Sequence, residues 1–154
     1  MAYGTTAGVE GRLPAMGPLS ALSLPTEAQV TAWLTQGAAI INRTLSGAGY
    51  STPVAVSAAV YAELTALNEL YAAAWAIRAR GLDTVQGENE DRSAVWLQEF
   101  QTQLTALVTF DLSRLGVEVL PSAAPNLARR RLRFTPLKRV DGYSAVYDDV
   151  EVDA

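Results

Sequence analysis

Residues 57–80 read SAAVYAELTALNELYAAAWAIRAR, and this stretch decides the fold class. Its apolar side chains recur every three or four residues, which is the spacing of one face of an α-helix. The members of this stripe are Val60, Leu64, Leu67, Tyr71 and Ala74. The many alanines favour a helix and allow neighbouring helices to approach closely. Ser57 is a candidate N-cap and Gly81 the expected end, so we predict one long helix here.

A second helix is predicted on the N-terminal side of this stretch. Thr26 and Gln29 stand in a Thr-x-x-Gln capping box, in which each side chain satisfies a backbone amide of the other residue. The apolar positions that follow lie on one helical face: Val30, Trp33, Leu34, Ile41 and Leu45. Gly47 and Gly49 then end the pattern, so we expect this helix to begin at residue 26 and to end near residue 47.

A third helix is predicted on the C-terminal side, after a short polar connection at residues 82–88. Asn89, Glu90 and Asp91 provide a cap and two acids at its start, where the helix dipole favours negative charge. Its core side contains Trp96, Leu97, Phe100, Leu104, Leu107, Val108, Leu112 and Leu115. Gly116 is the expected end. The short connection favours antiparallel packing against the preceding helix, and core packing is the expected role of Trp33, Trp75 and Trp96.

The two ends of the chain do not continue the helical pattern. Residues 1–24 contain several Gly and Pro and no sustained period, which predicts an extended arm that is ordered only by a partner. From residue 117 the pattern alternates as in a strand, and Asp141-Gly142 is a hairpin signal. We therefore predict a mainly α protein in which a three-helix core domain, residues 25–116, lies between an N-terminal arm and an extended or hairpin-like C-terminal arm, residues 117–154.

The C-terminal arm is a charge dipole. Residues 129–139 contain six cations and no acid, whereas residues 141–153 contain five acids and no cation. Guanidinium groups bind carboxylates and phosphates in bidentate geometry, and Leu132 and Phe134 add an apolar face to the basic run. Three interpretations are open at this point: a solvated face of a flexible tail, a strand that docks on a protein partner, or a nucleic-acid contact.

The composition argues against an enzyme. The 154 residues include no Cys and no His, and Lys138 is the single lysine, so the usual nucleophiles, general bases and soft metal ligands are missing. No phosphate-binding, Ca²⁺-binding or nucleophile-elbow motif is present. We expect no catalytic residue, no cofactor and no metal. The acids at 88–91 are explained by helix capping, and Asp148–Glu151 by a solvated acidic end.

The overall charge and hydropathy exclude further classes. A formal net charge of −4 disfavours a general duplex-DNA binder, which draws its affinity from clustered cations. No run of about 18 apolar residues occurs, and the first residues have no basic, apolar secretion signal. We therefore expect synthesis in the cytoplasm and no membrane partner.

The order of these features resembles a known family. A Gly/Pro-bearing arm, the capped helix Thr26–Leu34, Ile41-Asn42, the Gly-Tyr-x-x-Pro turn at Gly49–Pro53, two Ala-rich helices and a charged tail follow one another. This arrangement is similar to the head–tail connector (adaptor) proteins of tailed bacteriophages, over roughly residues 20–115. The resemblance implies a virion protein of the neck, made in the host bacterium. Its subunits would form a ring, usually of twelve copies, beneath the portal protein and above a stopper or tail-terminator-like protein.

The resemblance also implies roles for individual residues. Genomic DNA would pass through the ring without specific binding, and the candidates for acids that face the lumen are Glu63, Glu69, Asp83, Glu88 and Glu90. Docking on the portal would involve the C-terminal arm, through Arg129, Arg130, Arg131, Leu132, Arg133, Phe134, Lys138, Arg139, Tyr143 and Tyr147. Both arms would be ordered on assembly. The alternative function is a small helical regulator that binds nucleic acid through Arg129–Arg139.

Overall fold

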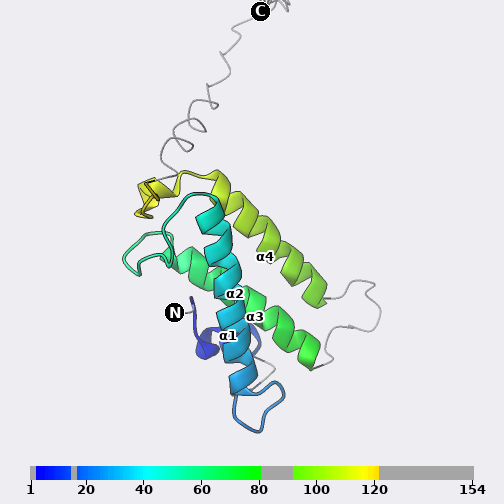
Figure 1. The fold of residues 1–154 in the computed structure, drawn as a ribbon. Helices are drawn as coiled ribbons and strands as arrows, with labels where there is room; N and C mark the ends of the chain where they lie inside the picture. Colours follow the sequence, from blue (N-terminus) through cyan, green and yellow to red (C-terminus); the bar gives the residue numbers. More distant parts are fainter. Residues whose placement is uncertain (1–2, 15–16, 81–91, 122–154) are drawn as a thin grey trace, which may run out of the picture.

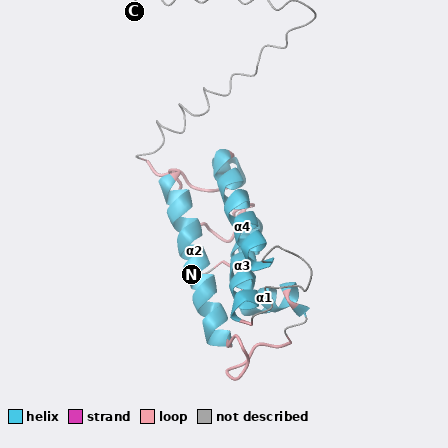
Figure 2. Cartoon of the chain, turned by 90° about the vertical axis from the view of Figure 1, so that its right-hand side faces the viewer, coloured by secondary structure: helices cyan, strands magenta, loops and turns pink. Residues whose placement is uncertain are grey.

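The computed structural model describes residues 3–14, 17–80 and 92–121, and it is mainly helical over these ranges. The helices, in chain order, are α1 (Thr6–Arg12), α2 (Glu27–Gly47), α3 (Tyr61–Ala79), α4 (Arg92–Thr109) and the short 3-10 helix η2 (Leu112–Leu115). Helix α3 packs against α2 and against α4, while α1 packs against α3 and α2 (Figures 1 and 2). The predicted fold class, a helical bundle around the Ala-rich stretch, is confirmed.

Helix α2 begins where its capping box predicts. The Oγ1 of Thr26 accepts a hydrogen bond from the Gln29 amide at 3.3 Å, and the Gln29 Oε1 accepts one from the Thr26 amide at 2.9 Å. The helix ends at Gly47 with Ala48 as C-cap, also as expected. Both ends are determined by residues within one turn of them, so the sequence pattern is sufficient here.

Helix α3 begins four residues later than the predicted cap. Ser57 is exposed, and Val60 occupies the N-cap position without a side-chain hydrogen bond. The preceding residues form turns instead, because the Ala59 amide donates to the Leu115 carbonyl at 3.0 Å and the Tyr61 amide donates to the Ala58 carbonyl at 2.9 Å. A contact with a distant segment therefore overrides the local capping signal of Ser57.

Helix α4 ends at Thr109, seven residues before the expected stop at Gly116. Asp111 ends the regular helix, because its carboxylate accepts hydrogen bonds from the Ser113 amide at 3.3 Å and from the Ser113 hydroxyl at 2.6 Å. This local pairing caps η2, which Gly116 then closes in the left-handed conformation, φ 83°. The predicted start of the helix at Asn89–Asp91 and the connection at 82–88 lie outside the described residues.

The prediction of an extended N-terminal arm is wrong for the part of residues 1–24 that the structure describes. Residues 6–12 form α1, with Thr5 as N-cap, and its side chain accepts from the Gly8 amide. Val9 and Leu13 are buried in a cluster with side chains of α2 and α3. The helix is too short, and its apolar residues too few, for a periodic signal, so its order depends on the groove that receives it.

The C-terminal side of the fold contains one backbone bridge. Within the described residues there is no strand, and the segment that alternates in sequence forms an isolated antiparallel bridge between Tyr50 and Val119. Val117 is buried in the main core cluster. The packed region thus extends beyond the predicted core limit at residue 116, while the predicted hairpin at Asp141-Gly142 lies outside the described residues.

Helices α2 and α3 approach closely at Gly37, which is buried. A Cβ atom on Gly37 would lie 2.8 Å from Cδ1 of Tyr71 and nearer still to Oδ1 of Asn68. The Nδ2 of the fully buried Asn68 donates to the Leu34 carbonyl at 2.9 Å, so the same crossing also contains a hydrogen bond between the two helices. The partly buried Trp33, Trp75 and Trp96 pack against the core clusters, in line with the expected core role.

We expect Gly37→Ala to lower the free energy of unfolding by about 1–3 kcal/mol, because the added methyl group forces the helices apart. Gly47→Ala is the matched control, since it lies at the end of the same helix and a Cβ there has nothing within 4 Å. It should be neutral or slightly stabilising. Urea unfolding followed by circular dichroism measures both variants. Equal midpoints for the two would contradict the close crossing.

Candidate docking interface

The predicted docking residues all lie outside the described part of the chain: Arg129, Arg130, Arg131, Leu132, Arg133, Phe134, Lys138, Arg139, Tyr143 and Tyr147. The structure does describe the segment from which they continue. Residues 110–121, called the hook below, follow α4 and fold back beside the turn after α2 (Figure 1). How the hook is held determines which end of the bundle carries the start of the C-terminal arm.

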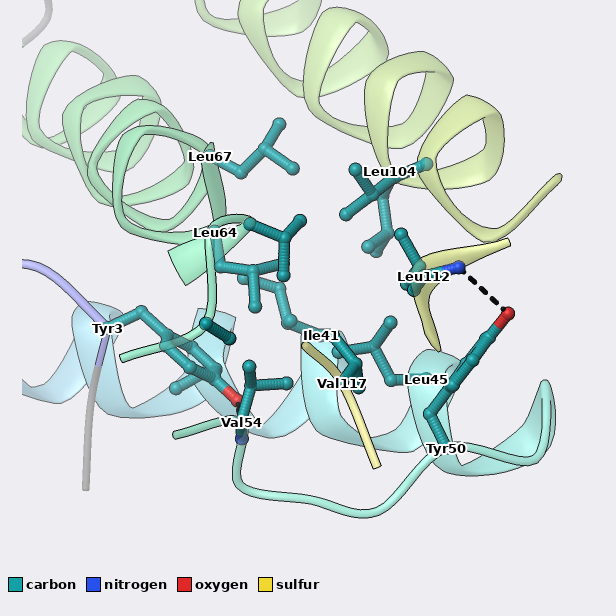
Figure 3. Packing of buried hydrophobic residues seen from close by; sticks show 14 of the residues in the cluster. Tyr3, Ile41, Leu45, Tyr50, Val54, Leu64, Leu67, Leu104, Leu112 and Val117 are labelled. Carbon is teal, nitrogen blue, oxygen red and sulfur yellow. Dashed lines mark hydrogen bonds between the residues drawn. The ribbon is translucent and has the colours of Figure 1, made fainter. Parts of the chain in front are cut away.

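Tyr50 holds the hook through its side chain. It is 1% exposed, and its ring lies in the main core cluster. The hydroxyl donates to the Phe110 carbonyl at 3.2 Å. It also accepts from the Leu112 amide at 3.2 Å, the bond drawn in Figure 3. The buried Leu112 amide would otherwise lack a partner, since two residues separate the end of α4 from the start of η2. The sequence placed Tyr50 in a turn but gave no sign of this role.

Backbone hydrogen bonds hold the end of the hook. The Ser51 amide donates to the Glu118 carbonyl at 2.7 Å, and the Leu120 amide donates to the Gly49 carbonyl at 2.9 Å. These two bonds flank the bridge between Tyr50 and Val119. Residues 117–120 are therefore extended and fixed against the turn after α2.

Two exposed apolar side chains lie on segments next to the hook's contacts. Phe110 is 64% exposed, and its carbonyl is the one that Tyr50 binds. Val56 is 68% exposed in the loop that reaches the hook through the hydrogen bond from Ala59 to Leu115. Both side chains would gain free energy from burial against a partner. We call Val56 and Phe110 the hook patch.

The five acids predicted to face a lumen do not share one environment. Glu63 is exposed in the first turn of α3, as that role requires. Glu69 instead contacts α1: its Oε1 accepts from the Thr5 amide at 3.2 Å, and its Oε2 lies 4.0 Å from Nε of Arg12, with the side chain 14% exposed. Its contacts within the chain explain this acid without a channel. Asp83, Glu88 and Glu90 lie outside the described residues.

Tyr3 fixes the other end of the described chain. Its side chain is 1% exposed; the hydroxyl donates to Oδ1 of Asn42 at 2.6 Å and accepts from the Val54 amide at 3.0 Å. Its ring lies edge-on to that of Tyr61, with 5.5 Å between centroids. Burial raises the pKa of Tyr3 above its ordinary value, against the opposing effect of the Val54 hydrogen bond. Sequence reasoning missed this residue, because a single tyrosine in a Gly-bearing segment carries no periodic signal.

Tyr50→Phe should lower the free energy of unfolding by about 1–3 kcal/mol, because the buried Leu112 amide loses its acceptor. The control is Tyr61→Phe, since the Tyr61 hydroxyl makes no hydrogen bond within the described residues. Chemical denaturation gives the stabilities, and hydrogen exchange at the Leu112 amide reports the hook directly. Unchanged protection of that amide in Tyr50→Phe would contradict the assigned role.

The stability of the protein should fall at alkaline pH partly through Tyr3. The pKa of Tyr3 is raised in the folded state. Its contribution to the free energy of unfolding is therefore complete below the pKa of the unfolded chain, about 10, and is lost as the pH rises through the pKa of the folded protein. The unfolded state releases the proton first, so unfolding becomes more favourable. Urea midpoints measured from about pH 8 to pH 11 should fall more steeply for the wild type than for Tyr3→Phe. Parallel curves would contradict this assignment.

Residues 3–14, 17–80 and 92–121 contain neither a metal-binding cluster nor a membrane span. No three or more acidic, His or Cys side chains gather there as a metal site would require, and no helix there is long and apolar enough to cross a membrane. No family model matches the chain, and no curated protein or solved structure matches it either.

Proposed function

We propose that this chain is a structural head–tail adaptor of a tailed bacteriophage. In this role about a dozen copies form a ring beneath the portal protein and extend the channel through which genomic DNA passes. A stopper or tail-terminator-like protein binds on the tail side. The protein is made in the host cytoplasm and acts in the virion neck, without catalysis, cofactor or metal.

The observation that carries this proposal is the anchored hook. Tyr50 and the Gly49–Ser51 backbone fix residues 110–120 at one end of a helical core. A highly charged arm then continues from a defined point on that core. A rigid body with a docking arm at one end suits a protein that joins two larger assemblies, and the Gly-Tyr-x-x-Pro turn that carries Tyr50 is also part of the family resemblance.

The chemistry near the hook indicates what the arm binds. The hook patch, Val56 and Phe110, provides apolar contact area, and Arg129–Arg139 provide guanidinium groups for carboxylates of a partner. A protein surface with acidic residues and an open sheet edge satisfies both. For the channel, a net charge of −4 and the exposed Glu63 suit DNA that slides without sticking.

Native mass spectrometry of the chain, alone and with the portal protein encoded in the same genome, tests the proposal. We expect the mass of the complex to show about a dozen copies per portal. Arg129→Ala/Arg130→Ala/Arg131→Ala and Phe110→Ser should each weaken association by about tenfold or more, since each removes about 1.4 kcal/mol or more at a docking contact.

Matched controls separate docking from charge and folding. Arg43→Ala/Arg78→Ala/Arg92→Ala makes the same change in net charge on the helices α2, α3 and α4, and Val95→Ser replaces another exposed apolar side chain, 42% exposed, on α4. Both should bind the portal as the wild type does. Absence of a portal complex, together with a shift of labelled DNA at physiological salt that the arginine variant abolishes, would instead favour the nucleic-acid-binding regulator.

A further inference from the structure

The N-terminal segment, residues 3–13, packs against α2, α3 and the loop after α2. The surface that this segment covers is called the Tyr3 groove. The Tyr3 hydroxyl is bound by Asn42 of α2 and by the Val54 amide, at 2.6 and 3.0 Å. The Tyr3 carbonyl accepts from Nδ2 of Asn68 on α3. Oδ1 of Asn42, the Val54 amide and Nδ2 of Asn68 therefore all find their partner in Tyr3.

The contacts of α1 itself are equally specific. Nη2 of Arg12 donates to the Ala66 carbonyl at 2.9 Å, and Glu69 accepts from the Thr5 amide. Gly4 and Gly8 lie against the Glu69 side chain; a Cβ on Gly4 would be 2.7 Å from its Cγ, and one on Gly8 would lie closer still to its carboxylate. The groove thus selects a segment with tyrosine and two small residues at fixed positions.

None of these contacts requires that the segment and the groove belong to the same copy of the chain. Each hydrogen bond to the groove joins residues 3–12 to positions at least 39 residues later. The connection between them is residues 14–26, which include Pro14, Pro18 and Pro25. Fully extended, 13 residues span at most about 45 Å, which is enough to reach a neighbouring helical subunit.

The connection also carries apolar side chains that the single chain leaves uncovered. Leu22 is 98% exposed and Leu24 is 61% exposed. Within the chain, the connection is held by the local Ser20–Ser23 turn and by the bonds from Leu19 to Glu10 and from Glu27 to Ser20. Nε of Arg80 also donates to the Leu24 carbonyl at 2.7 Å, yet both leucine side chains stay exposed. A neighbouring subunit would provide a surface against which to bury both leucines.

We propose that, in the assembled ring, the N-terminal segment of each subunit occupies the Tyr3 groove of the next subunit. The partner at this groove is thus a second copy of the chain, and its residues 3–13 make the contacts seen within one chain. Exchange of an identical element keeps those contacts and costs little in free energy. That the subunits form a ring rests on the proposed function, whereas the exchange of N-terminal segments between subunits has a test of its own.

Cross-linking of two single-cysteine variants tests the exchange, and the chain has no native Cys to interfere. Arg12→Cys and Ala66→Cys place thiols at positions that a 2.9 Å hydrogen bond now joins. The two variants are refolded together, alone and with the portal protein, and treated with a short bismaleimide. Arg12→Cys mixed with Thr102→Cys, on the exposed side of α4, is the control.

Exchange predicts covalent dimers of Arg12→Cys with Ala66→Cys in the ring, at least tenfold above the Thr102→Cys control. A variant that carries both Arg12→Cys and Ala66→Cys in one chain should then give, in the ring, successive subunits joined covalently to one another. Monomers with a link between their own two cysteines should be absent. A ring that yields only internal links overturns the exchange and leaves the adaptor proposal intact. If no ring forms on the portal, the adaptor proposal fails; internal links alone in the concentrated free chain then overturn the exchange as well.

Discussion

The fold depends on the side-chain amide of Asn68, which is buried where three segments meet. A buried amide must find hydrogen-bond partners, and its two donor hydrogens go to carbonyls of Leu34 in α2 and of Tyr3 at the N-terminal end. Gly37 provides the room for this side chain between α2 and α3. One residue of α3 therefore determines how closely α2 approaches and where the N-terminal segment lies.

Two tyrosines extend this arrangement to the loops. The Tyr3 hydroxyl binds the Val54 amide, and the Tyr50 hydroxyl binds the Phe110 carbonyl and the Leu112 amide. Each ring contributes apolar area to the core while its hydroxyl satisfies backbone groups that no helix pairs. The short stretch from residue 50 to residue 54 is thus in contact with both the N-terminal segment and the hook (Figure 3). The N-terminal segment and the hook, far apart along the chain, are held by one turn.

The sequence predicts those parts of this fold that depend on near neighbours. The ends of α2 follow from Thr26, Gln29 and Gly47, and the buried face of α3 follows from its helical period. The structure differs from the prediction where a contact with a distant residue determines the local conformation. The N-terminal segment that contains α1 is held by Asn68 of α3, and α3 begins after Ser57 because the Ala59 amide is bound by the Leu115 carbonyl. The C-terminal arm is distinguished in the sequence by its charge alone, and Tyr50, which holds the hook before it, is predicted only as part of a turn.

The contact between Asn68 and Tyr3 has a consequence for the order of events during synthesis. The two residues are 65 positions apart, so the groove does not exist when the N-terminal segment leaves the ribosome. Protein synthesis proceeds at about 5–20 residues per second. The side chains of Tyr3 and Val9, which are buried in the folded protein, are therefore exposed to water for several seconds before α3 emerges. On a polysome, neighbouring nascent chains expose their N-terminal segments during the same interval between synthesis of that segment and synthesis of α3. The N-terminal segment is therefore synthesised before α3 and can pack only after α3 has been made.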